Sequence, residues 1–156
     1  MCGALLTVLI LAAAEHPSGS VEQTQLMVDR FAARFQQVSP RMGDGLEELY
    51  APELTFRDPV TSLTGLDAMR AYLAHFGEVA DGARFIITDT VVTPGNAVVF
   101  WTMTPAGGGA AIDGVSHLRV RERIYDERDY FDLGQVYDQV PVLSWLTGLV
   151  KSRLAP

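Results

Sequence analysis

Apolar residues recur at helical spacing in the first half of the chain, and each such stripe predicts a helix. The first stripe follows Ser20, which together with Gln23 has the spacing of a capping box. It predicts a helix that runs from Ser20 to about Ser39-Pro40 and carries Met27, Phe31, Phe35 and Val38 on one face. A later stripe predicts another helix and consists of Leu66, Met69, Leu73 and Phe76.

Between these two helices the sequence predicts a shorter one. Asp44 and Glu47 repeat the capping-box spacing, and this short helix is expected to end at Tyr50-Ala51-Pro52. The chain then enters a predicted strand from Leu54 to Asp58 and a turn that ends at Gly65.

The second half changes to extended runs separated by turn residues. These runs predict a meander of four long antiparallel strands at residues 85–92, 97–104, 111–121 and 124–133. Pro141 opens a predicted last helix, whose apolar positions are Leu143, Leu146, Leu149, Val150 and Leu154. Helices, then a sheet, then a closing helix predict an α+β domain in which the helices cover one face of the sheet.

Length and charge narrow the class of protein. The 156 residues suit one domain, which we expect to span residues 20–156 behind an apolar extension at residues 1–19. With 48% hydrophobic residues and a formal net charge of -7, the chain has the composition of a soluble globular protein. The acidic balance argues against nucleic acid or an anionic membrane as its main partner.

The apolar run from Gly3 to Ala14 leaves two interpretations open. It is too short to span a bilayer, so no stable membrane insertion is expected, and no Lys or Arg precedes it. These flanks favour a packed or partner-facing helix, or an upstream extension of the reading frame, in a cytoplasmic protein. The alternative is a protein secreted after removal of residues 1–14. Cys2 is the only cysteine, which excludes an intramolecular disulfide and the usual thiolate zinc sites.

Two acidic segments carry the candidate chemistry. Asp58 lies in Phe56-Arg57-Asp58-Pro59, and a second acidic cluster spans Glu127 to Asp132 on the last predicted strand. Alternation along that strand puts Tyr125, Glu127, Asp129, Phe131 and Leu133 on the more apolar, inward face. The same test turns Ser116 inward and His117 outward. Two carboxyl groups that meet across an apolar cavity can do acid and base chemistry without a metal, because burial and mutual repulsion separate their pKa values.

The order of elements and two motifs resemble the nuclear transport factor 2-like superfamily, which includes ketosteroid isomerase, limonene epoxide hydrolase and the SnoaL-like polyketide cyclases. The motifs are the Tyr50-Ala51-Pro52 lead into residues 56–59 and the terminal Arg128-Asp129-Tyr130-Phe131-Asp132. The resemblance implies a cystatin-like roll, in which a cone-shaped, curved, mixed but mainly antiparallel sheet has helices on its concave face. It further implies an apolar pocket and a homodimer that pairs through the sheet.

The resemblance also implies roles for single residues. Asp58-Pro59-Val60 is similar to the segment that carries the isomerase's general base, which assigns that role to Asp58. The isomerase's two oxyanion donors, however, fall on Phe31 and Ser116 here, so efficient steroid isomerisation is not expected. Asp129 matches one catalytic aspartate of the epoxide hydrolase, but the strand that carries that enzyme's other charged groups has none in Val98 to Thr104.

Simpler structural roles stand beside these functional ones. Asp58 before Pro59 is typical of an Asx turn, and Asp129 has possible ion-pair partners in Arg57 and Arg128. No spacing of His, Asp or Glu indicates a metal site, and we expect neither metal nor cofactor. The expected pocket contains Asp58 and Asp129 as catalytic residues, with Phe31, Phe56, Tyr72, Trp101, Ser116 and Phe131 contacting the ligand.

The sequence therefore predicts a protein that binds a small lipophilic molecule, and a metal-free acid or base enzyme acting on it. Isomerisation, cyclisation and epoxide opening all use such residues, and the sequence does not choose among them. The alternative is a ligand-binding or protein-interaction module without chemistry, which the same fold also serves.

Overall fold

The computed structural model describes residues 19–138. The helices are α1 (Val21–Phe35), the 3-10 helix η1 (Leu46–Glu48), α2 (Leu66–Val79) and α3 (Leu133–Tyr137). The strands are β1 (Tyr50–Arg57), β2 (Ser62–Thr64), β3 (Arg84–Thr93), β4 (Asn96–Thr104), β5 (Ile112–Val120) and β6 (Ile124–Phe131).

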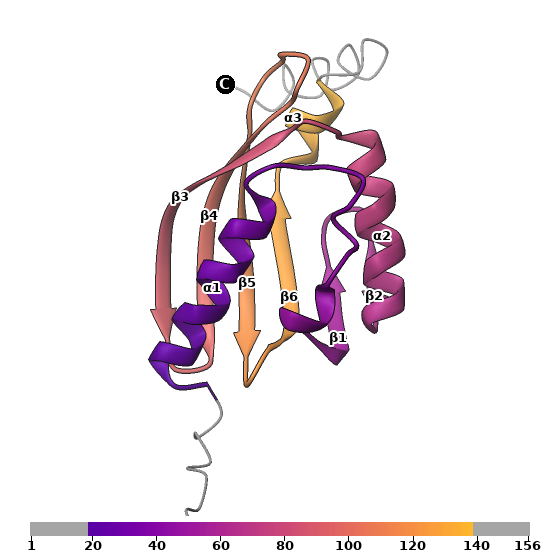
Figure 1. Cartoon of the computed structure of the whole chain (residues 1–156). Helices are drawn as coiled ribbons and strands as arrows, with labels where there is room; N and C mark the ends of the chain where they lie inside the picture. The colour runs from indigo at the N-terminus through magenta and orange to yellow at the C-terminus, as the bar shows by residue number, and fades with distance from the viewer. Residues whose placement is uncertain (1–18, 139–156) are drawn as a thin grey trace, which may run out of the picture.

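The six strands form one open, curved sheet in the order β2-β1-β6-β5-β4-β3. Strand β1 pairs with β6 in parallel, and every other neighbouring pair is antiparallel. Helix α1 lies across β3, β4 and β5, while α2 packs beside β1 and β2 on the same face (Figure 1). The predicted α+β class, with a mixed and mainly antiparallel sheet, is confirmed.

The first helix is shorter than predicted. Helix α1 has the expected Ser20 cap, whose side chain accepts from the N–H of Gln23, but it ends at Phe35 instead of Ser39. The next apolar residue of the stripe, Val38, is fully buried outside the helix. Its backbone N–H donates to the Ala83 carbonyl at 2.8 Å, so tertiary pairing replaces the last helical turn.

The predicted Asp44 cap is wrong. Helix η1 begins after Gly45, which has a left-handed φ of 62° and supplies no side-chain cap. The Asp44 carboxylate instead accepts from Arg41 Nε at 2.9 Å. Strand β1 also begins earlier than predicted, at Tyr50, and its pairing with β6 is irregular between Tyr50 and Thr55, where Pro52 has no N–H to donate.

Two short elements differ from the predictions, and two predicted segments fall outside the described residues. Strand β2 forms within the segment predicted to be a turn and pairs with β1, with Thr64 opposite Thr55. The last strand ends at Phe131 because Asp132 caps α3, accepting from the N–H of Gly134 at 2.7 Å. The helix expected from Pro141 and residues 1–18 of the apolar extension lie outside the described part.

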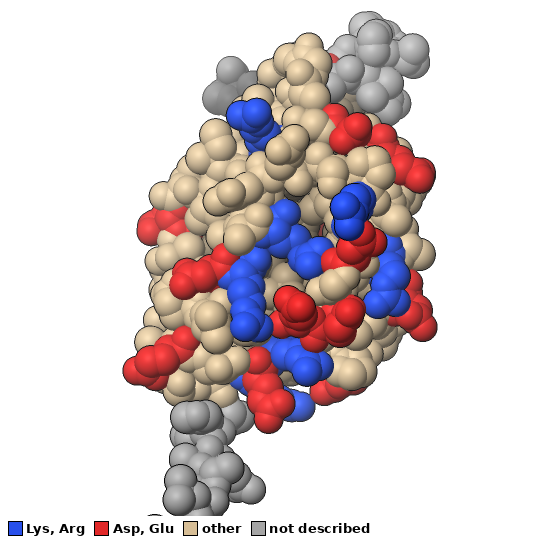
Figure 2. All heavy atoms as spheres, viewed as in Figure 1, with Lys and Arg blue, Asp and Glu red and all other residues tan. Residues whose placement is uncertain are grey.

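Charged side chains on the helix-bearing face are mixed in sign (Figure 2). Arg41 pairs with Asp44, and Arg70 reaches both Asp67 and Glu47. These pairs are exposed, so each contributes little to stability. Within residues 19–138, no helix combines the length and the apolar character that crossing a bilayer requires.

The core fills the space between the helices and the sheet, and Gly77 fixes how closely α2 approaches the loop after α1. Met27, Leu46, Leu54, Met69, Leu73 and Leu118 are among the fully buried side chains of the core. A Cβ atom placed on Gly77 would lie 2.0 Å from the Ser39 carbonyl oxygen, which is backbone and has little freedom to move. The packing therefore requires glycine at this helical position.

We predict that Gly77→Ala destabilises the protein by about 1–3 kcal/mol, the usual cost of overpacking. The sign is opposite to that of an unhindered helix interior, where alanine is more stable than glycine by about 1 kcal/mol. Urea unfolding measures the difference. Gly107→Ala is the control, because a Cβ there meets nothing within 4 Å. Equal stability of Gly77→Ala and wild type would contradict the close approach of α2.

Candidate active site

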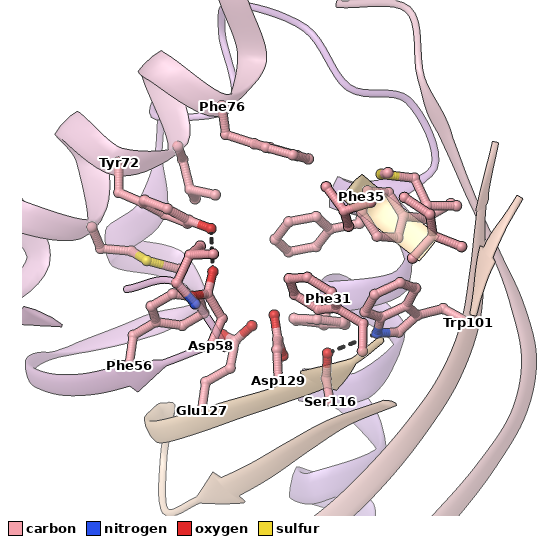
Figure 3. Close-up of a pocket in the computed structure, with 18 of the residues that line it drawn as sticks. Phe31, Phe35, Phe56, Asp58, Tyr72, Phe76, Trp101, Ser116, Glu127 and Asp129 are labelled. Carbon is pink, nitrogen blue, oxygen red and sulfur yellow. Dashed lines mark hydrogen bonds between the residues drawn. The ribbon is translucent and has the colours of Figure 1, made fainter. Parts of the chain in front are cut away.

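A cavity of about 220 Å³ lies between α1, α2 and the concave face of the sheet. Its walls are almost entirely apolar and rich in aromatic rings, including Phe31, Phe35, Phe56, Phe76, Phe85, Trp101 and Phe131. Three carboxyl groups interrupt this surface, and Figure 3 shows Asp58, Glu127 and Asp129 pointing into the cavity from one side. The volume is below the range of about 300–1,000 Å³ that is usual for ligand pockets, so it suits a compact molecule.

All eight residues expected from the sequence line this cavity. They are Phe31, Phe56, Asp58, Tyr72, Trp101, Ser116, Asp129 and Phe131. The predicted parity of the last strand holds from Glu127 onward, because Glu127 and Asp129 face inward while Arg128 and Tyr130 are exposed. It is wrong at the start of the strand, where the register with β5 shifts and Ile124, instead of Tyr125, is buried. The structure therefore brings these side chains together in one cavity, and their functional roles stay predictions.

Asp58 forms the predicted Asx turn and also lies in the cavity wall. Its Oδ1 accepts hydrogen bonds from the backbone N–H groups of Val60, at 2.7 Å, and Thr61. Its Oδ2 accepts from the Tyr72 hydroxyl at 2.6 Å, as Figure 3 shows. Three donors therefore fix the carboxylate, and both of its oxygens are occupied.

Tyr72 reaches the cavity from α2 and keeps its proton. Burial raises the pKa of its hydroxyl well above the usual range, and the hydrogen bond to Asp58 raises it further. The ring packs against Phe56 with centroids 5.1 Å apart. Tyr72 is accordingly a neutral donor that ties α2 to the turn after β1.

Asp129 differs from Asp58 because one of its oxygens has no partner. Its Oδ1 is buried and makes no hydrogen bond within the described part of the chain. Burial raises the pKa of Asp129 to about 7; a hydrogen bond from Ser116 opposes this shift, and the negative charge of Asp58 adds to it. Among the described residues, Asp129 forms no ion pair with Arg57 or Arg128. Arg128 instead lies over the Tyr130 ring, 5.1 Å from its centroid, on the other face.

A hydrogen-bonded chain holds the other side of Asp129. The Trp101 indole N–H donates to Ser116 Oγ at 3.0 Å, and Ser116 is the cross-strand neighbour of Asp129. Gly114 makes room for the indole, because a Cβ there would lie 2.1 Å from the Trp101 ring. The position of Trp101 therefore depends on the lack of a side chain at Gly114.

Glu127 is the carboxyl group of the site that the sequence analysis did not select. It is only 2% exposed, and the Tyr50 hydroxyl donates to its Oε2 at 2.6 Å. Burial raises the pKa of Glu127 well above its usual value, and the neighbouring charge of Asp129 raises it further. Its inward parity, shared with Asp129, was the signal that pointed to it.

The arrangement suits proton transfer at an apolar site. Glu127 and Asp129 interact, so their protons are lost in two steps that belong to the pair. Burial favours the proton on Glu127 while Asp129 titrates near neutral pH. Among residues 19–138, no three His, Cys, Asp or Glu side chains are grouped as a metal site.

The chain belongs to the SnoaL-like domain family, whose model matches residues 28–126. No curated protein matches it. This membership fits the architecture of a curved sheet that surrounds an apolar cavity.

Several solved structures share the fold. An NTF2-like protein of unknown function from Mesorhizobium loti is 27% identical, with a TM-score of 0.62, over 75% of this chain and 97% of that one. A candidate SnoaL-like polyketide cyclase from Jannaschia sp. CCS1 is 17% identical, with a TM-score of 0.65, over 75% and 90%. A protein with a ketosteroid isomerase-like fold from Catenulispora acidiphila, solved in complex with trimethylamine, is 22% identical, with a TM-score of 0.61, over 74% and 92%. At these last two identities the likeness concerns the fold alone.

We predict that Asp129 makes stability depend on pH. Its folded-state pKa of about 7 lies above the usual 3.8, so the folded protein keeps a proton that the unfolded chain releases. This carboxyl therefore favours folding below about pH 4, and its contribution is lost as the pH rises to about 7.

Urea unfolding of wild type and Asp129→Asn between pH 4 and pH 8 tests this expectation. The free energy of unfolding of wild type, relative to the variant, should fall as the pH rises through this window. Asp81→Asn, at an exposed position, should run parallel to wild type. The same parallel course for Asp129→Asn would show that Asp129 titrates normally.

Proposed function

We propose that this protein binds a small, mostly apolar molecule in the cavity and moves a proton on it, with Asp129 as the acid-base group. The observation that carries the proposal is the buried, unpaired Oδ1 of Asp129, which faces an apolar cavity and belongs to a carboxyl with a pKa of about 7. A group whose pKa lies near the working pH is the most effective proton carrier. Membership of the SnoaL-like family supports an isomerase or cyclase type of reaction.

The three carboxyl groups take different roles in this proposal. Asp129 in its ionised form removes a proton from a carbon next to a carbonyl group, and the neighbouring protonated Glu127 stabilises the charge that develops. Return of the proton from Asp129 to another carbon completes an isomerisation without any further reagent. Asp58, which the resemblance marks as the base, has both oxygens occupied, so we assign it the positioning of Tyr72.

Epoxide opening is the less favoured reaction of the three. It needs a charged partner to activate a water molecule, and β4 contributes none, since its inward residues are apolar. Isomerisation and cyclisation need only the proton carrier and the cavity, both of which the residues provide.

We further propose the cytoplasm as the compartment of this protein, because no Lys or Arg precedes the apolar run from Gly3 to Ala14.

The second candidate function is binding without chemistry. It is favoured by Asp58, because both of its oxygens accept hydrogen bonds from three donors. These bonds stabilise the Asx turn and hold α2 in place, which is a sufficient role for Asp58 without any reaction. It also fits the Ser116 hydroxyl, which already takes part in the chain from Trp101 to Asp129. In this case the buried acids determine which ligand binds.

A turnover assay separates the two candidates. We predict that the protein converts 3-cyclohexen-1-one, a compact ketone, into its conjugated isomer, and that Asp129→Asn lowers the rate by about 10²–10⁴-fold because it removes the proton carrier. Ultraviolet absorbance of the conjugated enone reports the reaction. Asp113→Asn, on the outer face of β5, should keep the wild-type rate. Full activity of Asp129→Asn would exclude the proposed role, and binding without turnover would favour the second candidate.

We further propose a homodimer that pairs through the outer face of the sheet. Phe100, Val115 and Tyr130 are direct cross-strand neighbours on β4, β5 and β6. Phe100 is 37% exposed and Tyr130 48% exposed, so the row presents apolar surface to solvent in the single chain. Contiguous apolar surface of this kind is typical of an interface.

Light scattering should give the mass of two chains for the wild type. We predict that the double replacement Phe100→Glu and Tyr130→Glu gives the mass of one chain, because it places like charges across the interface. Val79→Glu is the control, since Val79 is 73% exposed at the end of α2 and lies outside this row. A wild type with the mass of one chain at high concentration would contradict the dimer.

A further inference from the structure

We propose that the cavity selects a cation: a small protonated amine whose N–H donates to Asp129 Oδ1 while its hydrocarbon part packs against the aromatic walls. This inference names the ligand class for the second candidate function, binding without chemistry, because an amine bound in this way occupies the oxygen atom that would otherwise carry the proton. It rests on the proposed function only in placing a ligand in that cavity. The charge of the site, its aromatic walls and its unpaired oxygen atom support it.

Among the described residues, the cavity contains acidic groups and no basic side chain. Asp58, Glu127 and Asp129 line it, and its described lining includes no Lys, Arg or His. None of the three acids takes part in an ion pair among the described residues. An ionised carboxylate in an apolar cavity without a cation is costly, and a cationic ligand supplies what the protein omits.

Arg34, whose charge partly offsets the rise that burial causes in the pKa of Tyr50 beside the site, does not fill this role. Arg34 on α1 influences Tyr50, but its guanidinium donates to the backbone carbonyls of Met42, Asp44 and Gly45. These bonds hold it at the loop after α1, and it is not part of the cavity lining. The site therefore keeps its negative charge in the free protein whenever Asp129 is ionised.

The aromatic walls suit the remainder of such a ligand. Trp101 and Phe85 meet edge to face with centroids 5.0 Å apart, and Trp101 and Phe131 lie 6.2 Å apart. These contacts hold the three rings in place in the cavity wall. Figure 3 shows Trp101 and Phe35 on the side of the cavity away from Asp58. Faces of aromatic rings attract an ammonium group and its alkyl substituents, more strongly where water is excluded.

The unpaired oxygen of Asp129 determines where the ammonium group of the ligand binds. Asp129 Oδ1 is buried, lacks a donor among the described residues, and belongs to the side chain that Figure 3 shows extending into the cavity between Glu127 and Ser116. Both oxygens of Asp58 accept from Tyr72 and the turn, and Oε2 of Glu127 accepts from Tyr50. Asp129 Oδ1 is the buried acceptor without a donor among the described residues, and a charge-assisted bond to it is about twice as strong as a neutral one.

The pH dependence of binding follows from the groups that face Asp129. These are Asp58 after β1, Tyr72 on α2, Glu127 on β6 and Tyr50 on β1, while Ser116 contributes its hydroxyl from β5. Both tyrosines stay neutral, because burial raises their pKa values. Near pH 7 the change of charge therefore belongs to the Asp129 and Glu127 pair. A cation gains affinity when this pair ionises, whereas a neutral ligand with an acceptor atom loses it.

Three ligands of one shape test the proposal: cyclohexylamine, cyclohexanol and cyclohexanecarboxylate. The ammonium group of cyclohexylamine, like that of lysine, stays protonated to about pH 10. Calorimetric titration of the full chain at pH 8 should show cyclohexylamine binding about tenfold tighter than cyclohexanol, with the carboxylate weakest. At pH 5 the advantage of the amine over the alcohol should disappear.

Two variants test whether the preference for the amine depends on Asp129. Asp129→Asn should remove the preference for the amine and keep cyclohexanol binding, whereas Asp113→Asn on the outer face should keep the preference. The comparison of wild type at pH 5 and pH 8 needs no variant, so it decides even if Asp129→Asn does not fold. Cyclohexanol binding as tightly as the amine at pH 8, or a preference that does not change with pH, would overturn this inference and leave the proposed function standing. Binding of none of the three would overturn both.

Discussion

The parallel pairing of β1 with β6 is the constraint on which the site depends. It joins segments about seventy residues apart, with Phe56 opposite Glu127 and Arg57 opposite Arg128. Because parallel neighbours run in the same direction, the turn that follows Arg57 emerges beside the end of β6. Asp58 therefore lies near Asp129, and no local feature of either segment would bring them together.

This pairing places three carboxyl groups in an apolar interior, which costs stability unless donors compensate. The fold supplies donors unequally: three for Asp58, the Tyr50 hydroxyl for Glu127, and Ser116 for Asp129, whose buried Oδ1 has no donor among the described residues. A uniformly satisfied cluster would suit a structural role. The remaining acceptor, which faces the cavity, explains why Asp129 carries both the proposed chemistry and the proposed choice of ligand.

The aromatic side chains and the acidic side chains of the cavity come from different parts of the chain, and each group fixes the position of the other. Trp101 occupies its place because Gly114 has no side chain, and its N–H holds Ser116 against Asp129. Tyr72 packs on Phe56 and donates to Asp58, so α2 cannot shift without disturbing the turn. The shape of the cavity therefore depends both on how α2 packs and on the register of the strands.

The sequence alone determined the class of fold and the inward faces of β5 and of β6 from Glu127 onward, because hydrophobic periodicity and alternation are local properties. Alternation by itself assigns Ser116, Glu127 and Asp129 to the inner face of the sheet and His117 to the outer face. Tertiary structure decided the features that local signals do not contain. Helix α1 ends early because Val38 pairs with Ala83, and η1 lacks the predicted cap because the Asp44 carboxylate accepts from Arg41. The hydrogen-bond partners of each carboxyl oxygen in the cavity were likewise set by the fold. Hydrogen-bond partners across the fold depend on register between distant strands, and for that reason the pKa of Asp129 and the role of Glu127 emerged only from the folded chain.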